Sequence, residues 1–78
     1  MNANTSTSQE TKKHRFFIRY HFAPDDFVEQ TVIAESENMA MLKGEEQMNK
    51  IRDLLHRPDG TQVMVNMQAV RYFSVLAA

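Results

Sequence analysis

Residues 14–35 read HRFFIRYHFAPDDFVEQTVIAE, and this stretch decides the fold. Aromatic and β-branched side chains alternate with basic ones in its first half, a pattern typical of a strand with two different faces. Pro24 suits the first central position of a turn, and Asp25 and Asp26 can hydrogen-bond their own backbone. A second strand is expected at about 28–35, so the stretch predicts an antiparallel hairpin.

The alternation also assigns side chains to faces. One face of the first strand carries Phe16, Ile18, Tyr20 and Phe22, and the other carries Arg15, Phe17, Arg19 and His21. We expect a register in which cross-strand neighbours match in polarity and charge. The expected pairs are Phe22 with Val28, Ile18 with Val32, Phe16 with Ala34, Arg15 with Glu35, Phe17 with Ile33, Arg19 with Thr31 and His21 with Glu29.

A helix is expected after the hairpin. Ser36 is a good N-cap residue, and Glu37 in the first turn complements the helix dipole. Helical spacing continues over 37–56, and Pro58 then ends the helix in a turn that includes Gly60. The expected inward stripe consists of Ala40, Met41, Gly44, Met48, Ile51 and Leu55.

The last segment, 61–78, again has strand character, but it is too long for one ordinary strand. We expect a break or bulge near 66–69, which gives strands at about 62–66 and 70–76; one long bent strand is the alternative. The predicted fold class is therefore α+β, in the order β-β-α-β-β. A single helix covers one face of a mainly antiparallel sheet.

Seventy-eight residues are enough for one small domain, which we place at 12–78 behind a polar, disordered tail at 1–11. The chain has no cysteine, so disulfides and cysteine-ligated zinc cannot reinforce it. Self-association is one of the remaining ways to stabilise so small a fold. The sequence shows no membrane-spanning run and no export signal, and we expect a cytoplasmic protein.

Catalysis is not expected, because the serines lie in no recognisable nucleophile motif and no phosphate-binding glycine loop is present. The three histidines share no metal-ligand spacing, so neither a metal nor a cofactor is predicted. The pair Asp25 and Asp26 is better explained by turn chemistry than by acid–base catalysis.

The leading functional hypothesis is a protein-binding module. A single helix covers one sheet face, and large apolar side chains remain on the other, which is typical of an interaction surface. We expect Arg15, Phe17, Arg19 and Ile33 to bind a protein partner of unknown identity, in a protein that also forms a homodimer. An adaptor or inhibitor of bacterial or phage origin fits such a small domain.

The alternative is a nucleic-acid-binding module. Its binding residues would be Lys12, Lys13, Arg15 and Arg19, with Phe17 stacking on bases. Two observations weigh against this alternative: the net charge is −1, and residues 22–37 contain five acidic side chains and no basic one.

Overall fold

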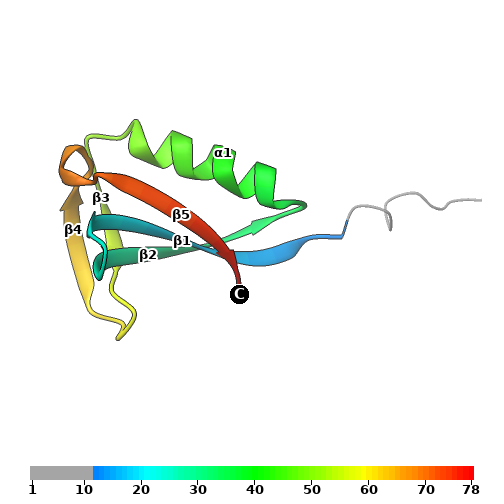
Figure 1. Cartoon of the computed structure of the whole chain (residues 1–78), viewed down its shortest axis with the longest axis horizontal. Helices are drawn as coiled ribbons and strands as arrows, with labels where there is room; N and C mark the ends of the chain where they lie inside the picture. The colour runs from blue at the N-terminus through cyan, green and yellow to red at the C-terminus, as the bar shows by residue number, and fades with distance from the viewer. Residues whose placement is uncertain (1–11) are drawn as a thin grey trace, which may run out of the picture.

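The computed structural model describes residues 12–78, and the predicted tail at 1–11 lies outside this part of the chain. The elements in chain order are β1 (His14–Ala23), β2 (Asp26–Ala34), α1 (Glu37–Met48), β3 (Arg52–His56), β4 (Gln62–Asn66), the 3₁₀ helix η3 (Met67–Ala69) and β5 (Tyr72–Ala77). In this part of the chain, five antiparallel strands form one sheet in the order β4-β3-β2-β1-β5, with α1 along one side (Figure 1). The predicted α+β class is confirmed, with one strand more than expected.

The β1–β2 hairpin forms as predicted, but its register is two residues away from the expected one. Phe16 lies opposite Val32 and Arg19 opposite Glu29, instead of Ala34 and Thr31. The reason is the turn: Ala23 pairs with Asp26 across two residues, and the register shifts in β1 between His21 and Ala23. A slip of two residues keeps every side chain on its face, so the predicted face assignment still holds.

Helix α1 begins where predicted and ends much earlier. The Ser36 hydroxyl accepts the backbone N–H of Met39 at 3.2 Å, which satisfies one of the free donors of the first turn. The helix ends at Met48 and is capped by Asn49, so the expected continuation to residue 56 is wrong. Gly44 lies on the inner side of α1, where a Cβ atom would come within 2.5 Å of the Phe73 ring. The absence of that atom lets the helix approach the sheet.

Residues 52–56 form strand β3 instead of the last helical turns. Cross-strand pairing decides the outcome, because β3 and β4 form a regular hairpin in which Leu55 lies opposite Val63 and Leu54 opposite Met64. Leu55 is buried, whereas Ile51, expected on the inward helical stripe, is 74% exposed. The apolar spacing of this segment fits a helix locally, but the strand that follows provides a β partner.

The predicted break in the last segment is confirmed. Strand β4 ends at Asn66, whose side chain accepts the backbone N–H of Gln68 and caps η3. Met67 in η3 is 1% exposed and anchors the break in the core. Strand β5 then returns along β1, with Phe17 opposite Leu76 and one register from Tyr72 to Ala77.

The core lies between α1 and the inner sheet face. Its largest fully buried side chains are Tyr20, Ile18, Met67 and Val28. The Tyr20 hydroxyl donates to the Gln30 side-chain oxygen at 2.6 Å, which satisfies the buried polar group. Burial raises the pKa of Tyr20, and the negative charge of Asp53 raises it further.

The β3–β4 hairpin joins the rest of the sheet at one point. Glu29 of β2 and His56 of β3 are the paired residues between these strands in the described chain. Figure 1 shows the hairpin at one end of the molecule, running across the direction of β1, β2 and β5.

None of the helices in residues 12–78 combines the length and apolar character needed to cross a membrane.

Candidate functional site

The sheet face opposite α1, called here the open face, has no second layer within residues 12–78. The even-numbered residues of β1 and β2 point toward α1, so the odd-numbered ones point to the open face. Its large apolar side chains are Phe17, Phe27, Ile33, Leu54, Met64, Tyr72 and Leu76. Four of them keep about half or more of their surface exposed: Ile33 (49%), Leu54 (52%), Met64 (63%) and Tyr72 (46%).

The four residues predicted to bind a partner all lie on this face. Arg15, Phe17 and Arg19 come from β1, and Ile33 comes from the neighbouring strand β2. The predicted pair of Phe17 and Ile33 is wrong in detail, because Phe17 lies opposite Thr31 and Ile33 lies opposite Arg15. The shorter turn therefore makes Phe17 and Ile33 diagonal neighbours on the same face.

Arg19 is already engaged within the protein. Its Nε atom donates to Glu29 Oε2 at 2.8 Å, and its guanidinium carbon lies 4.7 Å from the centre of the Phe27 ring. Glu29 is 7% exposed, so Arg19 neutralises a nearly buried carboxylate on the open face. The expected partner of Glu29 was His21, and the two-residue change of register replaces it with Arg19.

An aromatic ladder crosses three strands beside this ion pair. The His21 ring stacks on Tyr72 of β5 with centroids 4.5 Å apart, and it lies 5.2 Å from the Phe27 ring of β2. His21 is 8% exposed although it lies on the open face, because its neighbours enclose it. The ladder was not predicted, because the expected register pairs His21 with Glu29. A turn of only two residues, beginning at Pro24, shortens the loop and would have placed Phe27 opposite His21.

His21 also contacts Ser74, whose Oγ lies 3.0 Å from His21 Nε2. A serine nucleophile activated by histidine needs a third group that orients the imidazole through its other nitrogen. In the described chain, His21 Nδ1 is buried without a hydrogen-bond partner. Within residues 12–78, the contact between His21 and Ser74 therefore joins β1 to β5.

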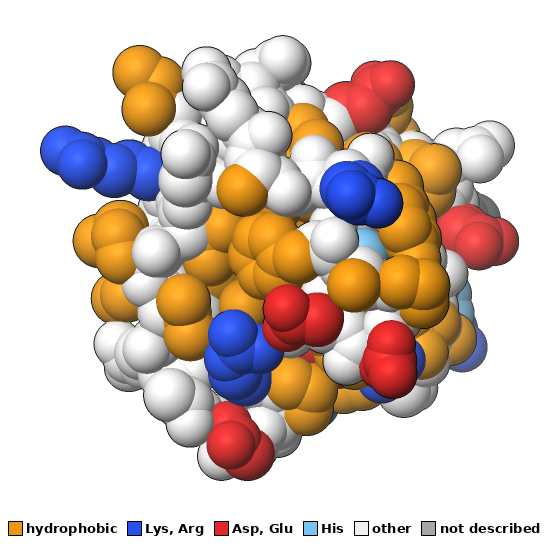
Figure 2. Space-filling model, turned by 60° about the vertical axis from the view of Figure 1, so that its left-hand side comes forward, with side chains coloured by type: hydrophobic (Ala, Val, Ile, Leu, Met, Phe, Trp, Pro, Cys, Tyr) orange, Lys and Arg blue, Asp and Glu red, His pale blue; other side chains and the backbone are white. Residues whose placement is uncertain are grey.

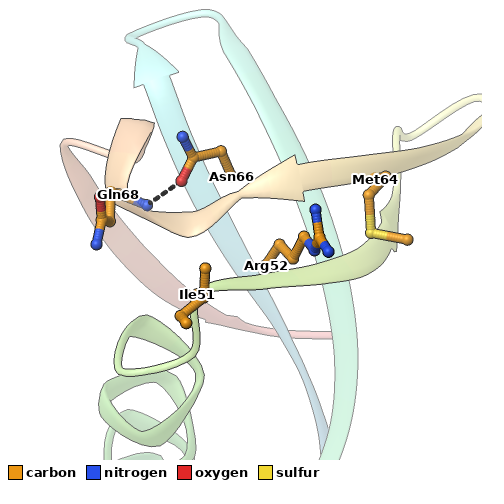
Figure 3. Close-up of a pocket in the computed structure, with 5 residues that line it drawn as sticks. All are labelled: Ile51, Arg52, Met64, Asn66 and Gln68. Carbon is orange, nitrogen blue, oxygen red and sulfur yellow. Dashed lines mark hydrogen bonds between the residues drawn. The ribbon is translucent and has the colours of Figure 1, made fainter.

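The β3–β4 end of the open face carries a shallow hollow of about 360 Å³. Its lining residues are Ile51, Arg52, Met64, Asn66 and Gln68 (Figure 3). Arg52 and Met64 project from neighbouring strands on the same side of the hairpin. Within residues 12–78, no carboxylate lies in ion-pair contact with Arg52, so its charge is available at the border of an apolar surface.

Hydrophobic side chains spread across the middle of the β3–β4 end when this end is turned toward the viewer (Figure 2). Basic and acidic side chains stand around them in the same view. An apolar centre within a charged border is the composition expected of a protein-binding surface.

Charged groups also organise the junction between α1 and β3. The carboxylate of Asp53 accepts the Gln47 side-chain amide at 2.9 Å, the backbone N–H of Leu54 at 2.7 Å and the Lys50 ammonium at 3.2 Å. These donors, with Gln47 first, lower the pKa of Asp53. The junction is thereby fixed by polar contacts at the base of the exposed hairpin.

Lys12 and Lys13, predicted as nucleic-acid contacts, are exposed and precede β1. With Arg15 they lie at the start of the hairpin, whereas the fourth predicted cation, Arg19, is paired with Glu29. Among residues 12–78, no cluster of three or more histidine, aspartate or glutamate side chains could hold a metal ion.

No family model matches the chain, and no curated protein or solved structure matches it either. The functional assignment therefore depends on the geometry of the site.

Proposed function

We propose that this protein is a small, non-enzymatic binding module that binds another protein through the open face. One observation carries the proposal: Ile33, Leu54, Met64 and Tyr72 are 46–63% exposed on a sheet face that has no second layer in residues 12–78. Large apolar groups at such a density mark an interaction surface. The ends of the face, with Arg15 and Arg52, supply positive charge for orientation.

The ordered interior of the face supports the same role. The ladder of His21, Tyr72 and Phe27 and the ion pair of Arg19 with Glu29 hold neighbouring side chains in fixed positions. A surface whose side chains are already ordered loses less conformational entropy when a partner binds. The proposed module is therefore pre-organised at β1 and β2 and more exposed at β3 and β4.

The experiment uses two leucines of equal exposure. Leu54 on the open face and Leu42 on the outer side of α1 are both 52% exposed. Tagged wild type, Leu54→Asp, Ile33→Asp and Leu42→Asp are each used to capture proteins from lysate of the native host, with quantitative mass spectrometry. We expect a protein captured by the wild type and by Leu42→Asp to be depleted about tenfold or more by the two open-face variants.

Equal capture by all four proteins would contradict the proposal, provided that circular dichroism shows each variant folded. The nucleic-acid alternative would give a different result. Capture would then vanish after nuclease treatment, fall steeply as salt rises and depend on Arg15 and Lys13 rather than Leu54.

The expected cytoplasmic location and the expected bacterial or phage origin belong to this proposal as well. Cell fractionation of the native host, followed by detection of the chain, tests the location; recovery in the soluble cytoplasmic fraction is the expected result.

A further inference from the structure

Strand β5 forms one edge of the sheet, and half of its backbone groups face away from β1. Arg15 O accepts the backbone N–H of Ala78 at 3.0 Å, in line with the register that sets Phe17 opposite Leu76. Backbone groups alternate in direction along an antiparallel strand, so Phe73, Val75 and Ala77 direct their N–H and C=O groups toward the free edge. No strand of residues 12–78 pairs with that edge.

The β5 edge lacks the usual protection against pairing. Natural edge strands are commonly blunted by charged side chains, proline or bulges. The stretch Tyr72–Ala77 reads YFSVLA and contains neither a charge nor a proline. Its pairing with β1 shows no register shift. The opposite edge, β4, is more polar, because it begins at Gln62 and ends at Asn66, which is used to cap η3.

Antiparallel pairing of two copies about a twofold axis at Val75 would bring large side chains opposite small ones. Hydrogen-bonded pairs would then join Phe73 to the partner's Ala77 and Val75 to the partner's Val75, so the residue whose ring packs under α1 would lie across from a small side chain. On the open face, Leu76 lies opposite the partner's Ser74, again large against small. No like charges meet along the strand, because it has none.

Helix α1 supplies a second element at the same edge. Met39 and Lys43 line a hollow beside Ile33 of β2, whereas Gly44 contacts Phe73 of β5. A rotation of 100° per residue places Met41 on the side of the helix that faces β5. Met41 is 41% exposed, although an inward position was expected for it. Edge pairing would cover it with the corresponding surface of a second copy.

We propose that a second copy of this chain pairs antiparallel with β5 and extends the two sheets into one. The pairing uses the edge of the sheet and leaves the open face accessible, so it does not depend on the function proposed above. A strand of this length and one helix side chain bury less than a standard interface of about 800 Å² per partner, so the dimer should be weak and concentration-dependent.

Amide hydrogen exchange at increasing protein concentration tests this inference residue by residue, together with the mass from analytical ultracentrifugation. We expect a dimer mass to appear as the concentration rises and the amides of Phe73, Val75 and Ala77 to become protected with it. The amides of Ser74 and Leu76 bond to β1 and should be protected at every concentration. A monomer mass up to about millimolar concentration, with fast exchange at the three edge amides, would overturn the proposal.

A pair of proline variants isolates the hydrogen bonds of the edge. Ala77→Pro removes an N–H that points to the free edge, a position where proline is tolerated. Ala78→Pro instead removes the N–H that donates to Arg15 within the same chain. We expect Ala77→Pro to weaken dimerisation about tenfold or more and Ala78→Pro to leave it nearly unchanged. Equal dimerisation of both variants, or a dimer that Ile33→Asp abolishes while the edge amides stay exposed, would refute edge pairing.

Discussion

The two faces of the sheet are built from the same strands, but in residues 12–78 one face is buried and the other is exposed. On the face under α1, Ile18, Tyr20 and Val28 have no exposed surface, whereas Ile33 on the open face remains 49% exposed. The two faces differ because α1 covers only one of them. Both faces carry large apolar side chains. Large side chains on the covered face stabilise the fold, and equally large ones on the open face remain about half exposed within residues 12–78.

Two isoleucines, Ile18 on the covered face and Ile33 on the open face, should show the largest difference in their contribution to stability. Ile18→Ala leaves a cavity in the core and should lower the free energy of unfolding by about 2–5 kcal/mol. Ile33→Ala removes a half-exposed side chain and should cost less than about 1 kcal/mol. Urea unfolding followed by circular dichroism measures both values. Similar decreases in the free energy of unfolding for the two variants would contradict a difference in packing between the two faces.

Gly44 tests how closely the helix must approach the covered face. Alanine is normally the better helix former by about 1 kcal/mol, but its Cβ atom at this position would lie 2.5 Å from Phe73 Cε1. We expect Gly44→Ala to destabilise the protein by about 1–3 kcal/mol in thermal unfolding. The double variant with Phe73→Leu should recover part of the loss. A stabilised single variant would show that α1 can move away from β5 without cost.

The ion pair of Arg19 and Glu29 is the polar exception on the open face. Glu29→Ala leaves Arg19 without its 2.8 Å acceptor, and because Arg19 remains one-third exposed, solvent compensates part of the loss. We expect a decrease of about 1–2 kcal/mol in the free energy of unfolding. Glu45→Ala, at an exposed helix position, serves as the control and should change it by less than about 0.5 kcal/mol.

Asp53 should produce the smallest effect, visible only in acid. The pKa of Asp53 is lowered in the folded protein. Its contribution to the free energy of unfolding is therefore complete above the pKa of the unfolded chain, about 3.9, and is lost as pH falls through the pKa of the folded protein. Asp53→Asn should therefore flatten the decrease of stability with falling pH in this window. Denaturant midpoints measured between pH 5 and pH 2 test this expectation. If the midpoint falls equally steeply with pH for wild type and variant, the lowered pKa of Asp53 does not contribute to the stability of the protein.

Face assignment in the hairpin was predictable because alternation has a period of two residues. The register was not, because a slip of two residues leaves the same side chains on each face and changes only their partners. The short turn at Pro24 decided between the registers, and with it the partner of Glu29 and the position of Phe27 beside His21.

The helix end was not predictable from its local spacing. Ile51 and Leu55 are four residues apart, as on a helical stripe, yet Leu55 is buried in β3 and Ile51 is exposed beside it. The deciding contact is with Val63, eight residues later in the chain. For the same reason the hollow beside Arg52 and Met64 could not be anticipated, since it exists only after the β3–β4 hairpin forms.

The most direct test of the open face as the functional side is carbene footprinting of the full chain, in buffer and in lysate of the native host. We predict that labelling of Ile33, Leu54 and Met64 falls in the lysate, while labelling of Leu42 on the outer side of α1 stays unchanged. Unchanged labelling at the three open-face residues, or equal protection of Leu42, would contradict a binding role for this face.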